Sequence, residues 1–134
     1  MRYFQRITIM NIRKPQHLDI NNELQWLGSS LGLFNLRDRD KSCFRVFIEL
    51  IKNAKKGISL SSDEIAFKLD LTRGTVIHHI NKLIDSGIVV QADGGYILRV
   101  GTLRELIDEV EKDLKRTCDD LRNMAEEIDK SLGL

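Results

Sequence analysis

The sequence lacks the features by which several classes of protein are recognised. It has no run of eighteen apolar residues, so we expect no membrane-spanning helix and no membrane partner. The N-terminus lacks the basic, then apolar, then small-residue order of a secretory signal, so none is expected. The two cysteines, Cys43 and Cys118, have no CxxC or Cys/His spacing, which favours a reduced, cytoplasmic setting.

Signatures of catalysis and of cofactor binding are missing as well. There is no glycine-rich phosphate loop, because Gly94-Gly95 is typical of a turn, and serine, histidine and aspartate residues are too scattered to propose a catalytic group. His78 and His79 are adjacent, so on a helix their side chains diverge by about 100° and cannot share a metal as an i, i+4 pair would. We therefore predict that the protein is not an enzyme and binds no cofactor and no metal.

The composition is that of an ordinary soluble protein with an uneven charge distribution. Its 134 residues, 42% hydrophobic and 31% charged, suffice for one domain with a modest core and an appendage. Residues 1–101 carry 15 Lys and Arg against 10 Asp and Glu, whereas residues 102–134 carry 6 against 10. A mildly basic body can lie against a polyanion while an acidic tail points away.

A helix-turn-helix is predicted between Ser61 and Gly87. Ser61 and Glu64 match a capping box that begins a short helix, and Thr72 is a good N-cap for a second one. The second helix has one apolar stripe, formed by Val76, Ile80, Leu83 and Ile84. Gly87 follows at the position where a left-handed residue commonly ends a helix. Two short helices joined by a tight turn form this motif.

The same stretch resembles the winged-helix DNA-binding domains of the ArsR and MarR type of bacterial and archaeal regulators. The matching segments are 63–66, 71–80 and 83–89, and the pattern covers about residues 40–100. Where the turn of these families usually holds glycine, this chain has Asp70, which tolerates the left-handed conformation better than most residues. The resemblance implies DNA binding by a dimer. Some ArsR-type proteins sense metals through cysteines, but the two thiols here lack a paired spacing.

The stripe on the second helix also fixes which residues point outward. At about 100° per residue, Thr75, His78 and Lys82 lie opposite the stripe. N-terminal residues of a recognition helix meet base edges in the major groove, and cations further along contact phosphate. The predicted DNA-contacting residues are Lys68, Thr72, Arg73, Gly74, Thr75, Ile77, His78, His79, Lys82 and Arg99. The alternative is a solvated face in a winged domain that binds protein instead of DNA.

A short hairpin is predicted after the second helix. Two β-rich runs, residues 88–91 and 96–100, flank the turn signal Asp93-Gly94 and form the wing. The tip carries Asp93 instead of a cation, and Arg99 is the one wing residue suited to gripping phosphate. Because phosphate contacts dominate affinity, this composition argues against strong contact between the wing and DNA.

Residues 1–39 are predicted to form an N-terminal extension of one strand and one helix. The strand, around Tyr3 to Ile12, follows from a partly alternating pattern and would have to join the wing or a partner chain. A disordered start is the alternative. Asp19 or Asn21 can cap the helix, which runs to about Leu31. The first core helix of the winged domain comes next, marked by an apolar face at Phe44, Phe47, Ile48 and Ile51.

The tail, residues 102–134, is predicted as one helix from Thr102 to Leu132, about 45 Å long at ~1.5 Å per residue. Core positions alternate in a 4-3-4-3 rhythm, in which polar Thr117 and Ser131 weaken the seam. The predicted dimerisation residues are the apolar members: Leu103, Ile107, Val110, Leu114, Leu121, Met124 and Ile128. Four heptads of this rhythm are typical of a coiled-coil seam. A surface helix folded back on its own domain would look similar over two heptads.

These patterns predict a mainly α fold with a small β wing. A winged helix-turn-helix domain, residues 40–101, would be followed by a long C-terminal coiled-coil helix. The function that fits best is a DNA-binding transcriptional regulator acting as a homodimer, with recognition helix 73–86 in the major groove of double-stranded DNA. The alternative is a winged-helix protein-interaction module without specific DNA binding. A non-specific chromosome-coating protein fits poorly with the modest basicity.

Overall fold

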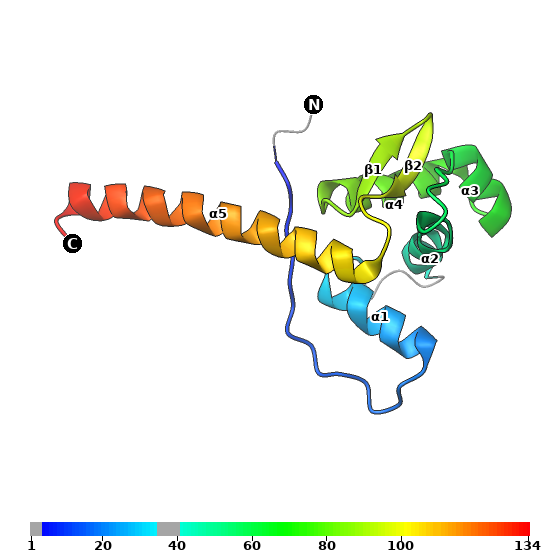
Figure 1. The fold of residues 1–134 in the computed structure, drawn as a ribbon, viewed down its shortest axis with the longest axis horizontal. Helices are drawn as coiled ribbons and strands as arrows, with labels where there is room; N and C mark the ends of the chain where they lie inside the picture. Colours follow the sequence, from blue (N-terminus) through cyan, green and yellow to red (C-terminus); the bar gives the residue numbers. More distant parts are fainter. Residues whose placement is uncertain (1–3, 35–40) are drawn as a thin grey trace.

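The computed structural model describes residues 4–34 and 41–134, and it is mainly helical with one small antiparallel sheet (Figure 1). The predicted boundary between residues 39 and 40 lies outside the described residues. The elements are α1 (Ile20–Ser30), α2 (Ser42–Ala54), α3 (Ser62–Leu69), α4 (Arg73–Asp85), β1 (Val89–Ala92), β2 (Gly95–Leu98) and α5 (Leu103–Leu132). This confirms the predicted fold class of a winged helix-turn-helix with a long C-terminal helix.

Local capping explains where α3 and α4 begin and end. Ser61 Oγ accepts from the amide of Glu64 while the Glu64 carboxylate accepts from the amide of Ser61, so the predicted capping box is confirmed. Asp70 ends α3 in the left-handed region, with φ of 54°, a conformation that aspartate tolerates better than most residues. Gly87, with φ of 78°, follows α4 as predicted.

The wing is a β-hairpin with a two-residue turn, and it is hydrogen-bonded to the chain segment before α3. β1 and β2 pair antiparallel with Val89 opposite Leu98, and both turn residues, Asp93 and Gly94, have positive φ. An isolated bridge adds Leu60 beside Tyr96 on β2, through Leu60 N to Tyr96 O at 2.9 Å and Tyr96 N to Leu60 O at 2.8 Å. The short segment between α2 and α3 therefore pairs with the wing through Leu60.

One hydrophobic core joins the winged domain to the two flanking helices. Its members include Val46, Phe47, Ile65, Val76, Ile80, Leu83, Ile88, Leu98 and Leu106. Leu27 of α1 and Leu103 of α5 pack against the same cluster. The core thus holds the helix-turn-helix rigidly and anchors the beginning of α5.

The predicted strand around Tyr3 to Ile12 is wrong over the residues that the structure describes. Residues 4–19, which we call the strap, have no regular secondary structure. The strap makes single backbone hydrogen bonds to helix ends: Arg6 N donates to Asp85 O at 2.8 Å, and Met10 N donates to Ser30 O at 2.7 Å. These carbonyls lie in the last turns of α4 and α1, where no intrahelical partner exists, so the strap satisfies helix ends instead of a sheet edge.

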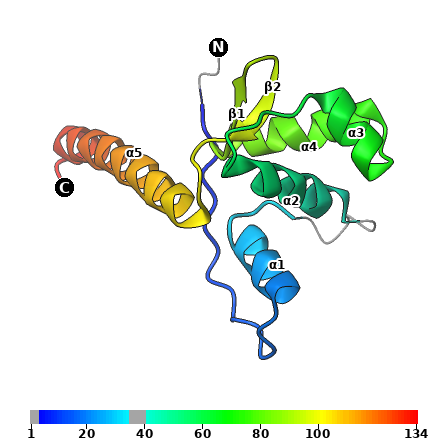
Figure 2. The same ribbon diagram turned by 45° about the vertical axis from the view of Figure 1, so that its right-hand side comes forward.

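Helix α5 leaves the winged domain as a straight arm, and the strap crosses it near the body (Figures 1 and 2). Thr102 caps it, through Thr102 Oγ1 accepting from the amide of Glu105 at 3.1 Å. Leu106, Val110 and Asp113 are buried on one side. From Leu114 onward the side chains are exposed, apart from the half-buried Asp119. Among the described helices, none combines the length and apolarity needed to cross a membrane.

Candidate nucleic-acid interface

Helix α4 has one side locked in the core and one side open to solvent. Val76, Ile80 and Leu83 are completely buried, as their predicted stripe requires. On the opposite side His78 is exposed, and Thr75 and Lys82 are half-buried. The second helix of the motif therefore has a fixed orientation and a polar outer face.

The first turn of α4 is held by a threonine pair. Thr72 Oγ1 accepts from the amide of Thr75 at 3.1 Å, and its hydroxyl lies 2.8 Å from Thr75 Oγ1, to which it donates. The hydroxyl proton of Thr75 is thereby left to donate outward. Gly74 is exposed, and a Cβ added there would meet nothing within 4 Å, so the backbone of this turn is open to close approach.

Arg73 lies at the beginning of the helix with a weak partner. Its Nε is 3.6 Å from Asp63 Oδ1, and the side chains of the two residues are 68% and 79% exposed. Exposed ion pairs of this kind contribute about 0–1 kcal/mol. The guanidinium can therefore exchange this partner for another acceptor at little energetic cost.

The adjacent histidines differ in their surroundings. His78 is exposed, whereas His79 is half-buried and its Nε2 lies 2.6 Å from Ser42 Oγ at the start of α2. The two rings meet edge to face with centroids 5.4 Å apart. Ile77 is half-buried on the other shoulder. Of the two predicted histidine contacts, His79 is thus already bonded within the fold.

Lys68 lies at the end of α3, and it shares the carboxylate of Glu49 with Lys52, both of α2. Its Nζ is 3.5 Å from Glu49 Oε2, and Lys52 Nζ is 3.5 Å from Glu49 Oε1. Both lysine side chains remain more than half exposed. This arrangement leaves a net positive charge beside the helix-turn-helix.

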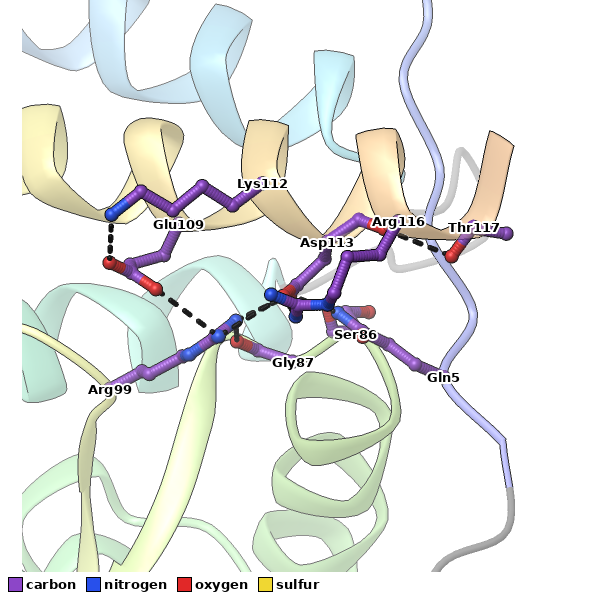
Figure 3. A network of polar contacts seen from close by, with 9 residues as sticks. All are labelled: Gln5, Ser86, Gly87, Arg99, Glu109, Lys112, Asp113, Arg116 and Thr117. Carbon is purple, nitrogen blue, oxygen red and sulfur yellow. Dashed lines mark hydrogen bonds and ion pairs between the residues drawn. The ribbon is translucent and has the colours of Figure 1, made fainter. Parts of the chain in front are cut away.

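Arg99, the predicted wing contact, is engaged in a polar network that we call the junction: Gln5, Arg99, Glu109, Asp113 and Arg116 (Figure 3). Its guanidinium donates to both carboxylate oxygens of Asp113, from Nη1 to Oδ2 and from Nη2 to Oδ1 at 3.1 Å. It also lies 3.4 Å from Glu109 Oε2. The Arg99 side chain is only 26% exposed, so it joins the wing to α5 in this structure.

Asp113 is the centre of the junction and a residue that sequence reasoning missed. It is 3% exposed and accepts hydrogen bonds from Gln5, Arg99 and Arg116. Hydrogen bonding to Arg99 holds the pKa of Asp113 below its ordinary value, against the opposing effect of burial. The same bond raises the pKa of Arg99. An aspartate following Leu106 and Val110 on one helix face was the available signal, because a buried carboxylate needs a partner.

The two cysteines and the other candidate metal ligands do not come together in the part of the chain that the structure describes. No group of three or more His, Cys, Asp or Glu residues could hold a metal ion there. Cys43 is buried, with Sγ 3.2 Å from Leu33 O, whereas Cys118 is exposed on α5. An open cleft of about 730 Å³ lies beside the junction, and of its charged lining residues Arg99 and Arg116 both donate to Asp113.

Comparison with known proteins gives one match, which covers the helix-turn-helix. Residues 57–90 match the model of the family described as "Bacterial regulatory protein, arsR family". The match spans the Leu60 bridge, α3, α4 and the beginning of β1. No curated protein and no solved structure matches the chain. The match supports a helix-turn-helix domain of the kind found in DNA-binding transcription regulators, which is not a family of enzymes.

Proposed function

We propose that this protein is a transcription regulator that binds double-stranded DNA as a homodimer and inserts α4 into the major groove. The observation that carries the proposal is the family match over α3 and α4, combined with an α4 whose apolar side is buried and whose polar side is open. Occupancy is the proposed mechanism: two copies of α4 enter successive major grooves and block or recruit the transcription machinery.

Base reading is assigned to the first two turns of α4. Arg73 can pair bidentately with guanine, while Thr75 and His78 can bond to base edges, and Gly74 lets the backbone approach. Lys68 and Lys82 suit phosphate contacts, because an ammonium attracts phosphate without reading sequence. We leave His79 and Arg99 out of the proposed contacts, since both are bonded inside the fold. Thr72 contributes as the cap of α4, and Ile77 stays a candidate for a thymine methyl.

Dimerisation is assigned to the outer part of α5. Ile107, Leu114, Leu121, Met124 and Ile128 are all exposed on a helix that projects from the body (Figure 2). Val110 is buried and Leu103 packs against the core, so these two predicted seam residues serve the protomer itself. An amphipathic helix with no cover on its apolar stripe gains stability when a second copy supplies that cover.

The test is sequencing of genomic fragments retained by the purified full-length protein at physiological salt. A regulator of this kind enriches a two-fold-related site, and Arg73→Ala or His78→Ala should each weaken binding to that site by about 1–3 kcal/mol. Arg13→Ala and His17→Ala, which change exposed residues of the strap, are matched controls and should bind as wild type does. Equal affinity of all four variants would argue against the assigned contacts.

A protein-interaction module is the second candidate, and one observation favours it. Phe67 on α3 is 90% exposed, a large apolar side chain at the surface of the helix-turn-helix. The wing tip with Asp93 also offers little to phosphate. A co-purified protein that is lost on Phe67→Ala, together with no salt-sensitive retention of DNA, would favour this candidate over the first.

A further inference from the structure

We propose that the junction sets the spacing between the two DNA half-sites, and that Gln5 of the strap is a specificity-determining residue for that spacing. This inference rests on the proposed function, because spacing has a meaning only for a dimer that reads two half-sites. It assigns a role to residues outside the family match, which covers only residues 57–90.

The junction is where three separate parts of the chain are bonded to one carboxylate (Figure 3). Asp113 Oδ2 accepts from Gln5 Nε2 at 2.9 Å and from Arg99 Nη1, while Oδ1 accepts from Arg99 Nη2 and from Arg116. Gln5 belongs to the strap and Arg99 follows β2 directly. A carboxylate that is buried and fully bonded has one preferred orientation, since each broken bond leaves a desolvated charge.

Gln5 also reaches the end of the recognition helix. The same Nε2 donates to Ser86 O at 3.2 Å, and the neighbouring Arg6 N donates to Asp85 O at 2.8 Å. Gly87 leaves room for this side chain, because a Cβ there would lie 2.1 Å from Gln5 Nε2 and displace it. Gln5 of the strap therefore connects the C-terminus of α4 to α5, although Gln5 and Asp113 are 108 residues apart in the sequence.

Asp113 is also the outermost point at which α5 is held. Leu106 and Val110 are buried closer to the beginning of the helix, and beyond Asp113 the side chains are exposed, with Asp119 half-buried. Apolar packing at Leu106 acts as a pivot, because it opposes separation but resists rotation poorly. The direction of the arm then depends on the polar bonds of Asp113.

The lever arm makes this dependence large. At about 1.5 Å per residue, Asp113 lies ~10 Å from the Leu106 pivot and Leu132 lies ~39 Å from it. A 1 Å displacement at Asp113 thus moves the far end of α5 by about 4 Å, which is about the 3.4 Å rise of one base pair. When two α5 helices are paired, the same rotation displaces each winged domain relative to the pair. A looser junction therefore widens the range of half-site spacings that the dimer can bind by about one base pair.

The first test measures the arm itself and needs no DNA. Spin labels on the exposed native Cys118 and on Asn81→Cys of α4 report the distance between α5 and α4, with labelled chains diluted in unlabelled ones so that one chain is measured. Cys43 is buried and is shielded from the label. Cys118 lies ~18 Å from the Leu106 pivot, so a 1 Å displacement at Asp113 moves it by about 2 Å. We expect one narrow distance distribution for wild type and one broader by about 2 Å for Gln5→Ala and Asp113→Asn. Gln16→Ala, an exposed strap glutamine, is the control.

The second test uses a library of sites in which only the spacer between half-sites varies. A one-base-pair change should weaken wild-type binding about tenfold, as a mismatched pair does, and weaken binding of Gln5→Ala by less than about threefold. The half-site sequence preferred by both proteins should be identical.

The outcomes separate the two proposals. Wild type without any two-fold site refutes the proposed function, while the label distances still decide whether the junction orients α5. Wild type with a preferred spacing that Gln5→Ala retains unchanged, or label distributions that are equal in all variants, overturns the inference.

Discussion

Gly95 is the residue whose replacement tests the attachment of the wing. It begins β2, and a Cβ built there would lie 2.7 Å from the carbonyl oxygen of Leu60 and 2.8 Å from its carbonyl carbon. Real Cβ atoms do not approach backbone atoms that closely, so Gly95→Ala must push Leu60 away. Two hydrogen bonds between Leu60 and Tyr96, of 2.8 and 2.9 Å, and the burial of the Leu60 side chain are at risk.

The magnitude follows from these contacts. Each lost hydrogen bond contributes about 1 kcal/mol net, and overpacking against a fixed backbone costs about 1–3 kcal/mol. Moving Leu60 away from the new Cβ relieves the overpacking but breaks its hydrogen bonds to Tyr96. The two costs are therefore alternatives in part, and they do not simply add. We expect Gly95→Ala to lower the free energy of unfolding by about 2–4 kcal/mol.

Urea unfolding at one fixed protein concentration measures this change, since the proposed dimerisation would make stability depend on concentration. Gly101→Ala is the matched control: a Cβ there meets nothing within 4 Å, and its φ is not positive. It should stay within about 0.5 kcal/mol of wild type. If Gly95→Ala is as stable as the control, Leu60 can shift without losing stability, and the close contact between Gly95 and Leu60 does not constrain the wing.

Three further predictions concern the junction, the cap of α4 and the arm. Asp113→Asn should lower the free energy of unfolding by about 1–3 kcal/mol at pH 7, since Arg99 and Arg116 lose their carboxylate partner. Because the pKa of Asp113 is lowered in the folded state, its contribution is complete above about pH 4 and is lost as the pH falls through the folded pKa. Urea titrations should therefore show a smaller difference in the free energy of unfolding between Asp113→Asn and wild type at pH 3 than at pH 7. An equal difference at both pH values would contradict this role of Asp113. Thr72→Ala should lower the free energy of unfolding by about 1 kcal/mol in thermal unfolding, because α4 loses its N-cap hydroxyl. Thr72→Ser keeps that hydroxyl and should retain most of the wild-type stability. Leu121→Glu should raise the dimer dissociation constant at least about tenfold in sedimentation analysis, with Lys130→Glu on the opposite side of α5 as the control; equal constants would remove α5 as the dimer interface.

Local signals in the sequence were sufficient for the helix-turn-helix and the wing. Ser61 and Thr72 cap helices where predicted, because a capping hydroxyl acts within three residues of the chain. Asp93-Gly94 forms the tight turn for the same reason, as both residues tolerate positive φ. The buried stripe of α4 was predictable from periodicity alone, and with it the residues that face outward.

Long-range contacts were not predictable in the same way. Gln5 and Asp113 are 108 residues apart, and nothing local to either residue names the other. The alternation in the strap suggested a strand, but its amides bond to the ends of α4 and α1, which no pattern within residues 4–19 could indicate. The heptad rhythm of α5 does not separate two environments: Val110 and Leu103 pack within the protomer, while Leu121 and Ile128 are exposed.

Because the outer half of α5 is uncovered, we expect the proposed DNA binding to depend steeply on the concentration of the protein. A helix without tertiary cover is only marginally stable in water, and the i, i+3 and i, i+4 ion pairs of Asp119 with Arg122 and Lys115 add only a few tenths of a kcal/mol each. We expect the outer turns to be frayed in single chains and to order as chains meet. The number of copies in a cell would then decide how much binding-competent protein exists, so occupancy of a target would rise with a threshold instead of in proportion to expression.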